Sequence, residues 1–433
     1  MKLAALGNTV ASYLRARRID ALQDPAAHAA IQSQWLARHL AWVTRHSGFY
    51  QPFVGQPLDA FPVIGKREWL EHFNDINTAG ADRGTMDALS RRAEQERDFS
   101  GTWRGHAYGL STGTSGRRAL FLASERERAT WAGTILAKIL GGRLLRKTRI
   151  ALVLRAGNTL YDSVGLLHIR FLYVDPFQAR AQTQERLRAF QPTILVAPPQ
   201  ILAWLASNPC GLRPERIISV AEVLDVLDRQ RIEATYGVPV EQIYQATEGL
   251  IGVSCEQGVV HLNEPFLYIE REWQDTTHTR FIPVVTDLWR RSQPVIRYRL
   301  DDVLQLLPSR CACGRLGTAV AAIEGRRDDL LHADGPDGPV PVFSDLLARI
   351  VVRAVEELDD FEIVEEIPGK WAVRLRPMPA FAEQQMLLDS LRDHVAALGA
   401  RPPAMRVEVL AEARDPRSKQ RRIRASEQVH CVR

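Results

Sequence analysis

The stretch that decides the fold runs through RIALVL (149–154), IRFLYV (169–174), TILVA (193–197), RIISVA (216–221) and QIYQ (242–245). Each of these short runs is rich in β-branched residues, which predicts a strand. Amphipathic stretches at 178–190 and 222–237 lie between the runs and predict helices. Strands that alternate with helices at this spacing predict a mostly parallel sheet with both faces covered.

On the C-terminal side of this stretch the pattern changes. Residues 259–307 contain five runs with alternating polarity, namely VVHLNE, FLYIER, TRFIPVVT, VIRYRL and VLQLLP. This alternation predicts an antiparallel sheet or a small barrel. On the N-terminal side, apolar residues at helical spacing within 29–46 predict an amphipathic helix.

The turn-rich stretch HADGPDGPVP (332–341) marks a domain boundary, and a helix is expected from Ser344 to about Leu358. The predicted fold class is therefore α/β with two domains. The large N-terminal domain, residues 1–328, combines a mostly parallel sheet with an antiparallel or barrel portion. The small C-terminal domain, residues 329–433, is of α+β type.

Composition limits the function classes. The 56 basic and 51 acidic residues give a net charge of +5, and the arginines are scattered, whereas nucleic-acid binding favours a concentrated patch. The only dense basic run, Arg414 to Arg424, has a solvated tail as its ordinary interpretation. No apolar run approaches the roughly 20 residues of a membrane span, and the N-terminal charges are not ordered as in a signal peptide. We therefore expect a cytoplasmic protein with no nucleic-acid or membrane partner.

A loop of hydroxyl residues and glycines is the strongest local motif. It consists of Ser111, Thr112, Gly113, Thr114, Ser115 and Gly116, and it precedes LFL (120–122), a predicted strand. Glycines let the backbone approach a polyphosphate, and the exposed N–H groups and hydroxyls can bind its oxygens. The P-loop motif of NTPases is absent, because no Lys-Ser or Lys-Thr pair follows.

Three weaker motifs carry polar groups. Tyr244-Gln245-Ala246-Thr247-Glu248-Gly249 ends a predicted strand, where open parallel sheets bind ligands. There Glu248 could hold Mg²⁺ and Thr247 could bond a phosphoryl oxygen. Asp302 follows YRLD and could accept both hydroxyls of a ribose. Arg326 lies beside the presumed domain boundary, where an ordinary salt bridge is the alternative.

The order and spacing of these four motifs resemble the adenylate-forming superfamily of acyl-CoA synthetases. The resemblance is closest to the phenylacetate–CoA ligase branch, which includes relatives that adenylylate a deazaflavin coenzyme. It extends over nearly the whole chain, through HSGFY (46–50), FPVIGKREW (61–69), VAEVL (220–224), YQATEG (244–249) and the lysine of DPRSKQRRI.

The resemblance implies roles for individual residues. Residues 111–116 would hold the ATP phosphates. The adenine would be bordered by Ala221, Glu222, Tyr244 and Gln245. Glu248 would bind Mg²⁺, Asp302 would bind the ribose, and Arg326 would lie near the nucleotide. Lys419 would contact the acid and the α-phosphate, Asp328 would be the hinge, and residues 155–168 would help to form the acid pocket.

The activity so implied is adenylation of a carboxylic acid, aromatic in this branch, followed by transfer to CoA or to an amine. The usual Pro-Lys after the phosphate loop is replaced by Arg118-Ala119, so Arg117 or Arg118 is the candidate substitute for that lysine. This and other departures weaken the case for CoA. Nucleotidyl transfer to a phenolic hydroxyl of a deazaflavin and a non-catalytic nucleotide-binding role remain alternatives, and a homodimer is one option for the assembly.

Three of the five cysteines, together with one histidine, suggest a metal site. Cys255, His261, Cys311 and Cys313 form C-x5-H and C-x-C pairs, the ligand types of a structural zinc site. The turn Cys313-Gly314 resembles a cysteine-rich turn that holds zinc in some members of the branch. Buried free cysteines are the alternative.

Overall fold

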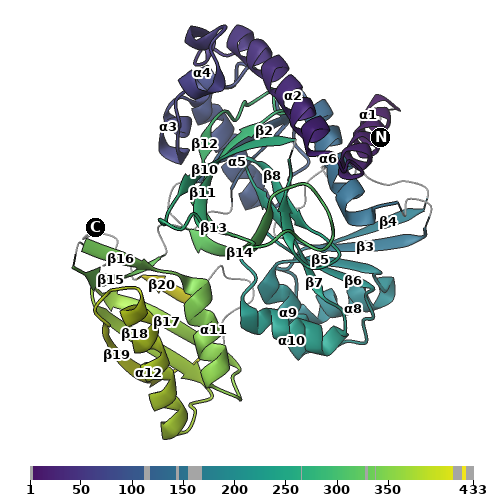
Figure 1. Cartoon of the computed structure of the whole chain (residues 1–433). Coiled ribbons are helices and arrows are strands. Elements are labelled where there is room, and N and C mark those ends of the chain that lie inside the picture. Colours follow the sequence, from purple (N-terminus) through teal and green to yellow (C-terminus); the bar gives the residue numbers. More distant parts are fainter. Residues whose placement is uncertain are drawn as a thin grey trace.

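The structure is a computed structural model that describes residues 3–111, 118–142, 146–154, 168–264, 266–326, 330–336, 338–412 and 422–425. Two modules follow one another along the chain and are distinct in Figure 1. We call the described residues up to 326 the large module and those from 330 onward the small module.

The parallel half of the main sheet confirms the predicted strand runs. Its strands are β3 (Thr148–Val153), β4 (Ile169–Val174), β5 (Ile194–Ala197), β6 (Arg216–Val220) and β7 (Val240–Ala246). They pair in the order β4-β3-β5-β6-β7, and every one of these pairings is parallel.

Both faces of this parallel half are buried, because alternate side chains of each strand point to opposite sides. Ile150 and Leu152 pack with α1 (Leu3–Asp20) and α6 (Glu125–Leu140). Ala151 and Val153 pack against the helices of the other face, which are α8 (Arg180–Phe190), α9 (Pro199–Ser207) and α10 (Val226–Tyr236). The near-continuous apolar strands follow from this double coverage.

One helix begins later than predicted. The amphipathic pattern placed its start at residue 222, whereas α10 begins at Val226. Asp225 caps the helix, since its side chain accepts a hydrogen bond of 2.8 Å from the backbone N–H of Leu227. Residues 221–224 are therefore a turn that faces the end of the sheet.

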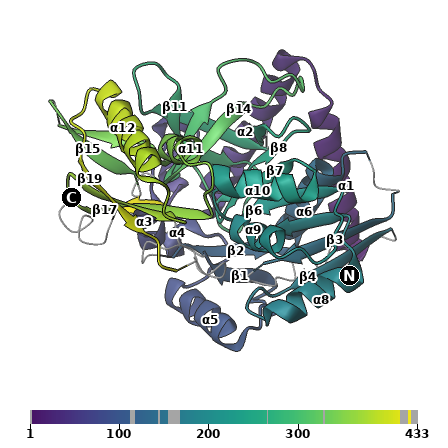
Figure 2. The same cartoon turned by 90° about the horizontal axis from the view of Figure 1, so that it is seen from below.

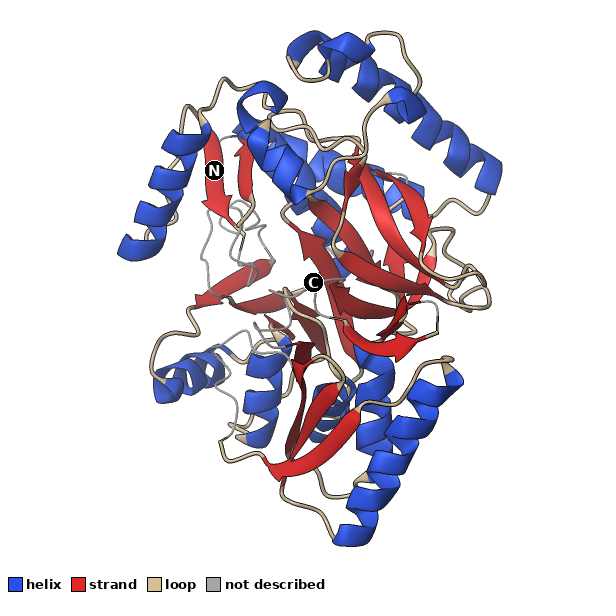
Figure 3. Ribbon diagram, turned by 90° about the vertical axis from the view of Figure 1, so that its left-hand side faces the viewer, coloured by secondary structure: helices blue, strands red, loops and turns tan. Residues whose placement is uncertain are grey.

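The antiparallel half continues the same sheet. It contains β8 (Gly249–Ser254), β9 (Val260–Leu262), β10 (Leu267–Trp273), β11 (Arg280–Asp287), β12 (Tyr298–Arg299), β13 (Asp302–Leu306) and β14 (Ala319–Arg326). The order β7-β8-β9-β14-β13-β11-β10 leaves a twelve-stranded, open sheet, and β12 pairs with β11. Of the two predicted alternatives the antiparallel sheet is correct, and no barrel closes within the described residues. Figure 3 shows these strands in the centre of the molecule with helices around them.

The N-terminal part covers the antiparallel half. The predicted amphipathic helix is α2 (Pro25–His46), whose N-cap is Asp24, and it is followed by α3 (Lys66–Glu71), α4 (Phe73–Ile76) and α5 (Arg83–Glu96). The short 3-10 turns Gln51–Phe53 and Leu58–Ala60 lie between α2 and α3. A hairpin of β1 (His106–Leu110) and β2 (Leu120–Ser124) then stands apart from the main sheet.

The small module has its own core and its own sheet. It contains α11 (Ser344–Ala354), β17 (Asp360–Ile367), β18 (Lys370–Arg376), α12 (Phe381–Ala397), β19 (Ala404–Val409) and β20 (Ile423–Ala425). The four-stranded sheet has the order β19-β18-β17-β20. In Figure 2 these yellow-green elements lie to one side of the parallel strands β3, β4 and β6.

The turn-rich stretch before α11 is a hairpin and not an irregular linker. Strands β15 (Leu331–Gly335) and β16 (Gly338–Val342) pair so closely that Gly335 faces Gly338. A side chain on Gly335 would meet the carbonyl oxygen of Gly338 at 2.8 Å, which explains the glycine. Among the described residues, no helix combines the length and the apolar character that a membrane-spanning segment needs.

Candidate active site

A cavity of about 670 Å³ opens at the carboxyl ends of β6 and β7. This is the edge at which open parallel sheets bind ligands. The cavity brings together most of the described candidate site residues, and its wall includes Ser111, Ala221, Glu222, Tyr244, Gln245, Thr247, Glu248 and Asp302. Ser344, Ala348 and Arg422 add a wall from the small module.

Tyr244 and Asp302 meet in the wall of this cavity. The hydroxyl of Tyr244, on β7, donates a hydrogen bond of 2.7 Å to Oδ2 of Asp302, the first residue of β13. The strands β8, β9 and β14 separate β7 from β13 in the sheet order, so the twist of the sheet brings the two side chains together. One carboxylate oxygen of Asp302 is thereby oriented, which suits an acceptor for a vicinal diol.

Glu248 is a buried carboxylate with two neighbouring hydroxyl groups. The hydroxyl of Thr247 donates to its Oε2 at 2.9 Å, and the side chain of Tyr298 forms a hydrogen bond with it. Burial, followed by the nearby charge of Glu248, raises the pKa of Tyr298 well above its usual value. Tyr298 therefore stays a hydrogen-bond donor. Arg290, which also lines the cavity, holds the turn by donating to the carbonyl oxygen of Thr247.

The turn after β6 has an unusual backbone. Ala221 has a φ of 69°, in the left-handed region that residues with a Cβ seldom adopt. Such strain is found at functional sites more often than elsewhere, because the surrounding structure has to enforce it. The turn also precedes the capped start of α10, so Glu222 is held at the rim of the cavity.

The hydroxyl-rich loop connects β1 to β2. Its residues Thr112, Gly113, Thr114, Ser115 and Gly116 lie outside the described residues, as does Arg117. The two ends of the loop are fixed: the N–H of Ser111 donates to the carbonyl oxygen of Ala119 at 2.7 Å, and the N–H of Ala119 donates to the hydroxyl of Ser111 at 2.8 Å. The hairpin is therefore closed at the base of the loop, where Ser111 and Ala119 line the cavity.

Arg118 has a different role from the one expected as a substitute for the missing lysine. Its Nε donates to the carbonyl oxygen of Ser111 at 2.6 Å, and its two terminal nitrogens form a forked ion pair with Glu94 of α5. A guanidinium used in this way fixes the base of the loop. The structure therefore indicates that Arg118 links the base of the loop to α5 through an ion pair.

The remaining predicted positions are only partly described. Arg326 ends β14, and its backbone lies opposite Asp302 in the register, which places it beside the cavity wall at Gly325. Lys419, the hinge candidate Asp328 and the pocket segment 155–167 lie outside the described residues. The ordinary interpretation of the basic run as a solvated tail does not hold for Arg422, which is buried and ion-paired.

The apolar part of the cavity is not predicted by any motif in the sequence. It is lined by Trp131 and Ile135 of α6, Phe171 of β4, and Phe266 and Trp289 from loops of the antiparallel half. The available signal was the apolar face of α6, whose buried residues run from Ala129 to Leu140. Helical periodicity alone assigns such a face to the core, so a cavity beneath it could not be inferred.

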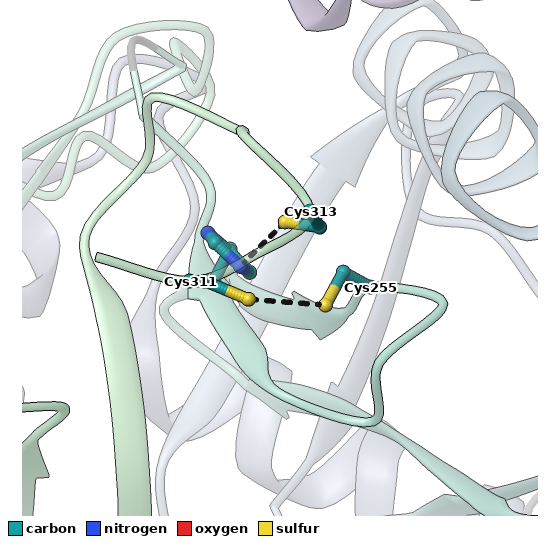
Figure 4. A group of neighbouring side chains, drawn as sticks. Cys255, Cys311 and Cys313 are labelled. Carbon is teal, nitrogen blue, oxygen red and sulfur yellow. Dashed lines mark hydrogen bonds between the residues drawn. The ribbon is translucent and has the colours of Figure 1, made fainter. Parts of the chain in front are cut away.

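The four predicted metal ligands come together (Figure 4). The ligand atoms of Cys255, His261, Cys311 and Cys313 all lie within 4.8 Å of one another. Sγ of Cys255 is 3.8 Å from Sγ of Cys311, and Sγ of Cys313 is 3.3 Å from Nε2 of His261. The cysteines are free, so this is a group of thiols and not a disulfide.

Bonds around the cluster orient its ligands. Nδ1 of His261 lies 2.9 Å from the carbonyl oxygen of Gly317, so it is placed to donate there and to leave Nε2 facing the thiols. Burial lowers the pKa of His261, which favours the neutral, metal-binding form. Backbone N–H groups of Gln257 and Arg315 point at Cys255 and Cys313, at 3.4 and 3.5 Å.

No family model matches this chain. Among curated proteins, it is 26% identical over 216 residues to a phenylacetate-coenzyme A ligase of Thermus thermophilus and 24% identical over 276 residues to one of Pseudomonas putida. These alignments cover 42% and 58% of this chain, and they span only 46% and 61% of the length of the two relatives.

Solved structures of 2-hydroxyisobutyryl-CoA ligase share the fold over nearly the whole chain. In its postadenylation state with 2-HIB-AMP, the TM-score is 0.68 at 17% identity, with 96% of this chain and 93% of that chain covered. In the thioesterification state of the same protein, the TM-score is 0.57 at 16% identity and the same coverage. The chain therefore has the fold of the acyl-CoA ligases of the adenylate-forming superfamily, and part of it is similar in sequence to the phenylacetate-coenzyme A ligases.

Proposed function

We propose that this protein is an ATP-dependent ligase that adenylates a carboxylic acid and then transfers the acyl group to CoA or to an amine. One observation carries the proposal: within this fold, the oriented Tyr244–Asp302 pair and the buried carboxylate of Glu248 face one cavity at the carboxyl ends of β6 and β7. The homologous phenylacetate-coenzyme A ligases support the assignment.

In the first step, an oxygen of the substrate carboxylate attacks the α-phosphorus of ATP. The bond to the bridging oxygen breaks, so that pyrophosphate leaves and acyl-AMP remains. Asp302 would accept the ribose hydroxyls, and the loop 111–116 would bind the phosphates with its N–H groups and hydroxyls. Ala221, Glu222, Tyr244 and Gln245 would border the adenine.

Glu248 has the properties of a magnesium ligand. Its carboxylate is buried at the cavity wall, carboxylate oxygens are hard ligands, and Mg²⁺ in such sites is held by one or two carboxylates plus phosphates. Magnesium would neutralise the charge of the phosphates. Thr247 fixes the Glu248 carboxylate through the 2.9 Å hydrogen bond and keeps its backbone position through Arg290.

Lys419 would neutralise the charge that develops on the α-phosphate, because a fixed cation stabilises such a transition state. In the second step, the sulfur of CoA or the nitrogen of an amine attacks the acyl carbonyl. AMP leaves with the electrons of the acyl–oxygen bond, and the nucleophile loses its proton. We also propose that the modules act as domains, 1–328 and 329–433, with Asp328 as the hinge between the two steps.

The apolar end of the cavity supports an aromatic or similarly apolar acid. Trp131, Phe266 and Trp289 supply flat side chains there, next to the aliphatic Ile135. An aryl group can stack on such surfaces.

The cysteine cluster is proposed to be a structural zinc site. Zinc bonds of about 2.3 Å to sulfur and about 2.0 Å to nitrogen place tetrahedral ligand atoms roughly 3.5–3.8 Å apart. The distances of 3.8 Å and 3.3 Å in the cluster are close to this spacing. With four protein ligands the coordination shell would be full, so the metal would stabilise the loops and take no part in catalysis.

ATP–pyrophosphate exchange across a panel of aryl and aliphatic acids tests the function, with wild type compared to Lys419→Ala and Glu248→Ala. Exchange that requires one class of acid and both residues is expected. Arg406→Gln is the matched surface control, because Arg406 is exposed on the small module and pairs only with Glu366 and Glu408 among the described contacts. CoA and primary amines are then added to identify the acceptor.

The absence of exchange with every acid, despite measurable ATP binding, would contradict acid adenylation. Release of pyrophosphate with AMP retained on a deazaflavin would instead identify the phenolic acceptor. ATP binding without any turnover would leave a non-catalytic nucleotide-binding protein.

A further inference from the structure

Arg422 connects the two modules through three carboxylates, of which Asp228 and Asp360 are buried and Asp225 is partly exposed. Its Nη1 and Nη2 each lie 2.8 Å from one oxygen of Asp228 on α10, and Nη1 lies 3.2 Å from Asp225. Its Nε donates to Asp360, the first residue of β17, at 2.8 Å. Asp225 and Asp228 belong to the large module, whereas Asp360 and Arg422 belong to the small one.

The network is almost completely removed from water. The side chains of Arg422, Asp228 and Asp360 are 4%, 5% and 8% exposed. Buried ions are expensive to desolvate and depend on one another, so removal of one partner leaves the others without compensation. An arrangement of the two modules that keeps these ions buried but loses some of their contacts is therefore strongly disfavoured.

Two further contacts join α10 to the small module at the boundary between the modules, which we call the seam. Leu227, between the two aspartates, packs into the core of the small module with Leu347 and Val351 of α11. Arg231, one turn further along α10, donates to the carbonyl oxygen of Asp359 at 2.6 Å. Helix α10 thus meets the small module along one face, and its first turn carries the ionic contacts.

The seam adjoins the proposed active site. Arg422, Asp225 and Asp228 contribute to the cavity wall beside Ala221 and Glu222. The whole chain superposes on the postadenylation state of 2-hydroxyisobutyryl-CoA ligase with a TM-score of 0.68 and on its thioesterification state with a TM-score of 0.57, at equal coverage. The contacts of Arg422 thus occur in an overall structure that is more similar to the postadenylation state.

We propose that Arg422, held by Asp225 and Asp228, is a positioning residue that selects the module arrangement for adenylation and has to release α10 before acyl transfer. This inference rests on the proposed function and adds to it the residues that control the change between the two steps. Asp360 stays with Arg422 in the small module and keeps the guanidinium oriented.

The test compares the full-length wild type with Arg422→Gln, Arg422→Lys and Asp228→Asn. Hydrogen exchange of the apo protein reports the seam directly, through the amides of 226–231 and 359–363. We expect Arg422→Gln and Asp228→Asn to increase exchange in both segments by roughly 30-fold or more, since one partner of a buried ion pair is lost. Arg422→Lys keeps the charge without the fork and should give a smaller increase.

The matched control is Arg216→Gln. Arg216 forms a comparable forked ion pair with Glu241, but both residues lie on strands of the large module. This control should lower the melting temperature without increased exchange at 359–363. Unchanged exchange at the seam in Arg422→Gln would overturn the proposal, whether or not the protein proves to be a ligase.

The second readout separates the half-reactions, with the acid that supports exchange in the wild type. Arg422→Gln should slow pyrophosphate release by roughly the same 30-fold, while transfer from bound acyl-AMP to the acceptor is not slowed. A purely structural role would slow both steps in parallel, and that result would contradict the proposal.

Discussion

The hydroxyl of Tyr244 lies 2.7 Å from Oδ2 of Asp302, and this contact joins the parallel and antiparallel halves of the sheet in the wall of the cavity. The two residues are 58 positions apart in the sequence. The bond orients a carboxylate that would otherwise rotate freely, so it prepares the site before ATP binds.

Asp302→Asn should weaken ATP binding. The amide oxygen can accept from one ribose hydroxyl, but the charge that strengthens both hydrogen bonds is lost, so we expect Kd to rise by about 10–100-fold. Tyr244→Phe keeps the charge and should raise Kd by only about threefold to tenfold. Isothermal titration with ATP measures both, and Asp389→Asn on the exposed face of α12 is the control. Equal affinity of Asp302→Asn and wild type would remove Asp302 from the nucleotide site.

The ion pair between Arg118 and Glu94 predicts that its loss raises KM for ATP more than KM for the acid. Glu94→Gln and Arg118→Ala remove the contacts that hold the base of the phosphate loop. The base then has to be ordered when ATP binds, and the lost conformational entropy weakens the binding of ATP. We expect KM for ATP to rise by roughly tenfold, with a smaller change in KM for the acid. Arg92→Gln is the matched control, because Arg92 pairs with Glu96 on the same helix and is exposed. A similar effect of the control would assign the change to helix α5 as a whole.

The raised pKa of the Asp287 carboxyl predicts that the stability of the protein depends on pH. Burial is the main reason that the pKa of its carboxyl rises to about 6, although the N–H groups of Trp289 and Arg290 oppose this rise. A folded-state pKa above the unfolded value means that the folded protein binds more protons between about pH 4 and pH 6. Stability from this group is therefore present below pH 4 and is lost as the pH rises to 6.

Asp287→Asn keeps the acceptor for both N–H groups but has no charge to bury. Relative to wild type, its free energy of unfolding should be similar at pH 4 and higher by about 1–2 kcal/mol at pH 7. Urea unfolding of both proteins at the same series of pH values measures this difference, and any common loss of metal in acid cancels in the comparison. A constant difference across the series would show that Asp287 does not titrate in this interval.

Zinc is expected at one atom per chain. Removal by a chelator should lower the melting temperature by roughly 5 °C or more, because the cluster holds together two loops from distant parts of the sequence. His261→Ala and Cys311→Ser should reduce the zinc content, measured by elemental analysis. Cys210→Ser should not, since Cys210 is buried on the other side of the parallel sheet, among Leu205 and Leu212. Protein that folds to the same stability without metal would show that the cluster is a group of buried thiols.

The sequence determined the parts of this protein that depend on local patterns. Apolar runs such as RIALVL predicted the parallel strands because a strand buried on both faces has few polar positions. The motifs at 111–116 and 244–249 predicted a phosphate-binding loop and a polar strand end, because they combine glycine, hydroxyl and carboxylate groups. The structure brings Ser111 and residues 244–249 to one cavity, and the binding of phosphate stays a prediction. Even the four metal candidates were named by type and spacing.

Contacts between distant segments were decided only by the tertiary structure. Local periodicity does not report how far a sheet twists, so it could not show that Tyr244 reaches Asp302 or that the apolar face of α6 borders a cavity. The same limit explains Arg422, which looks like a tail residue in its basic run but is buried by three aspartates from other elements. A charge is buried or solvated according to its partners in space, and those partners are set by packing, which the order of residues does not state.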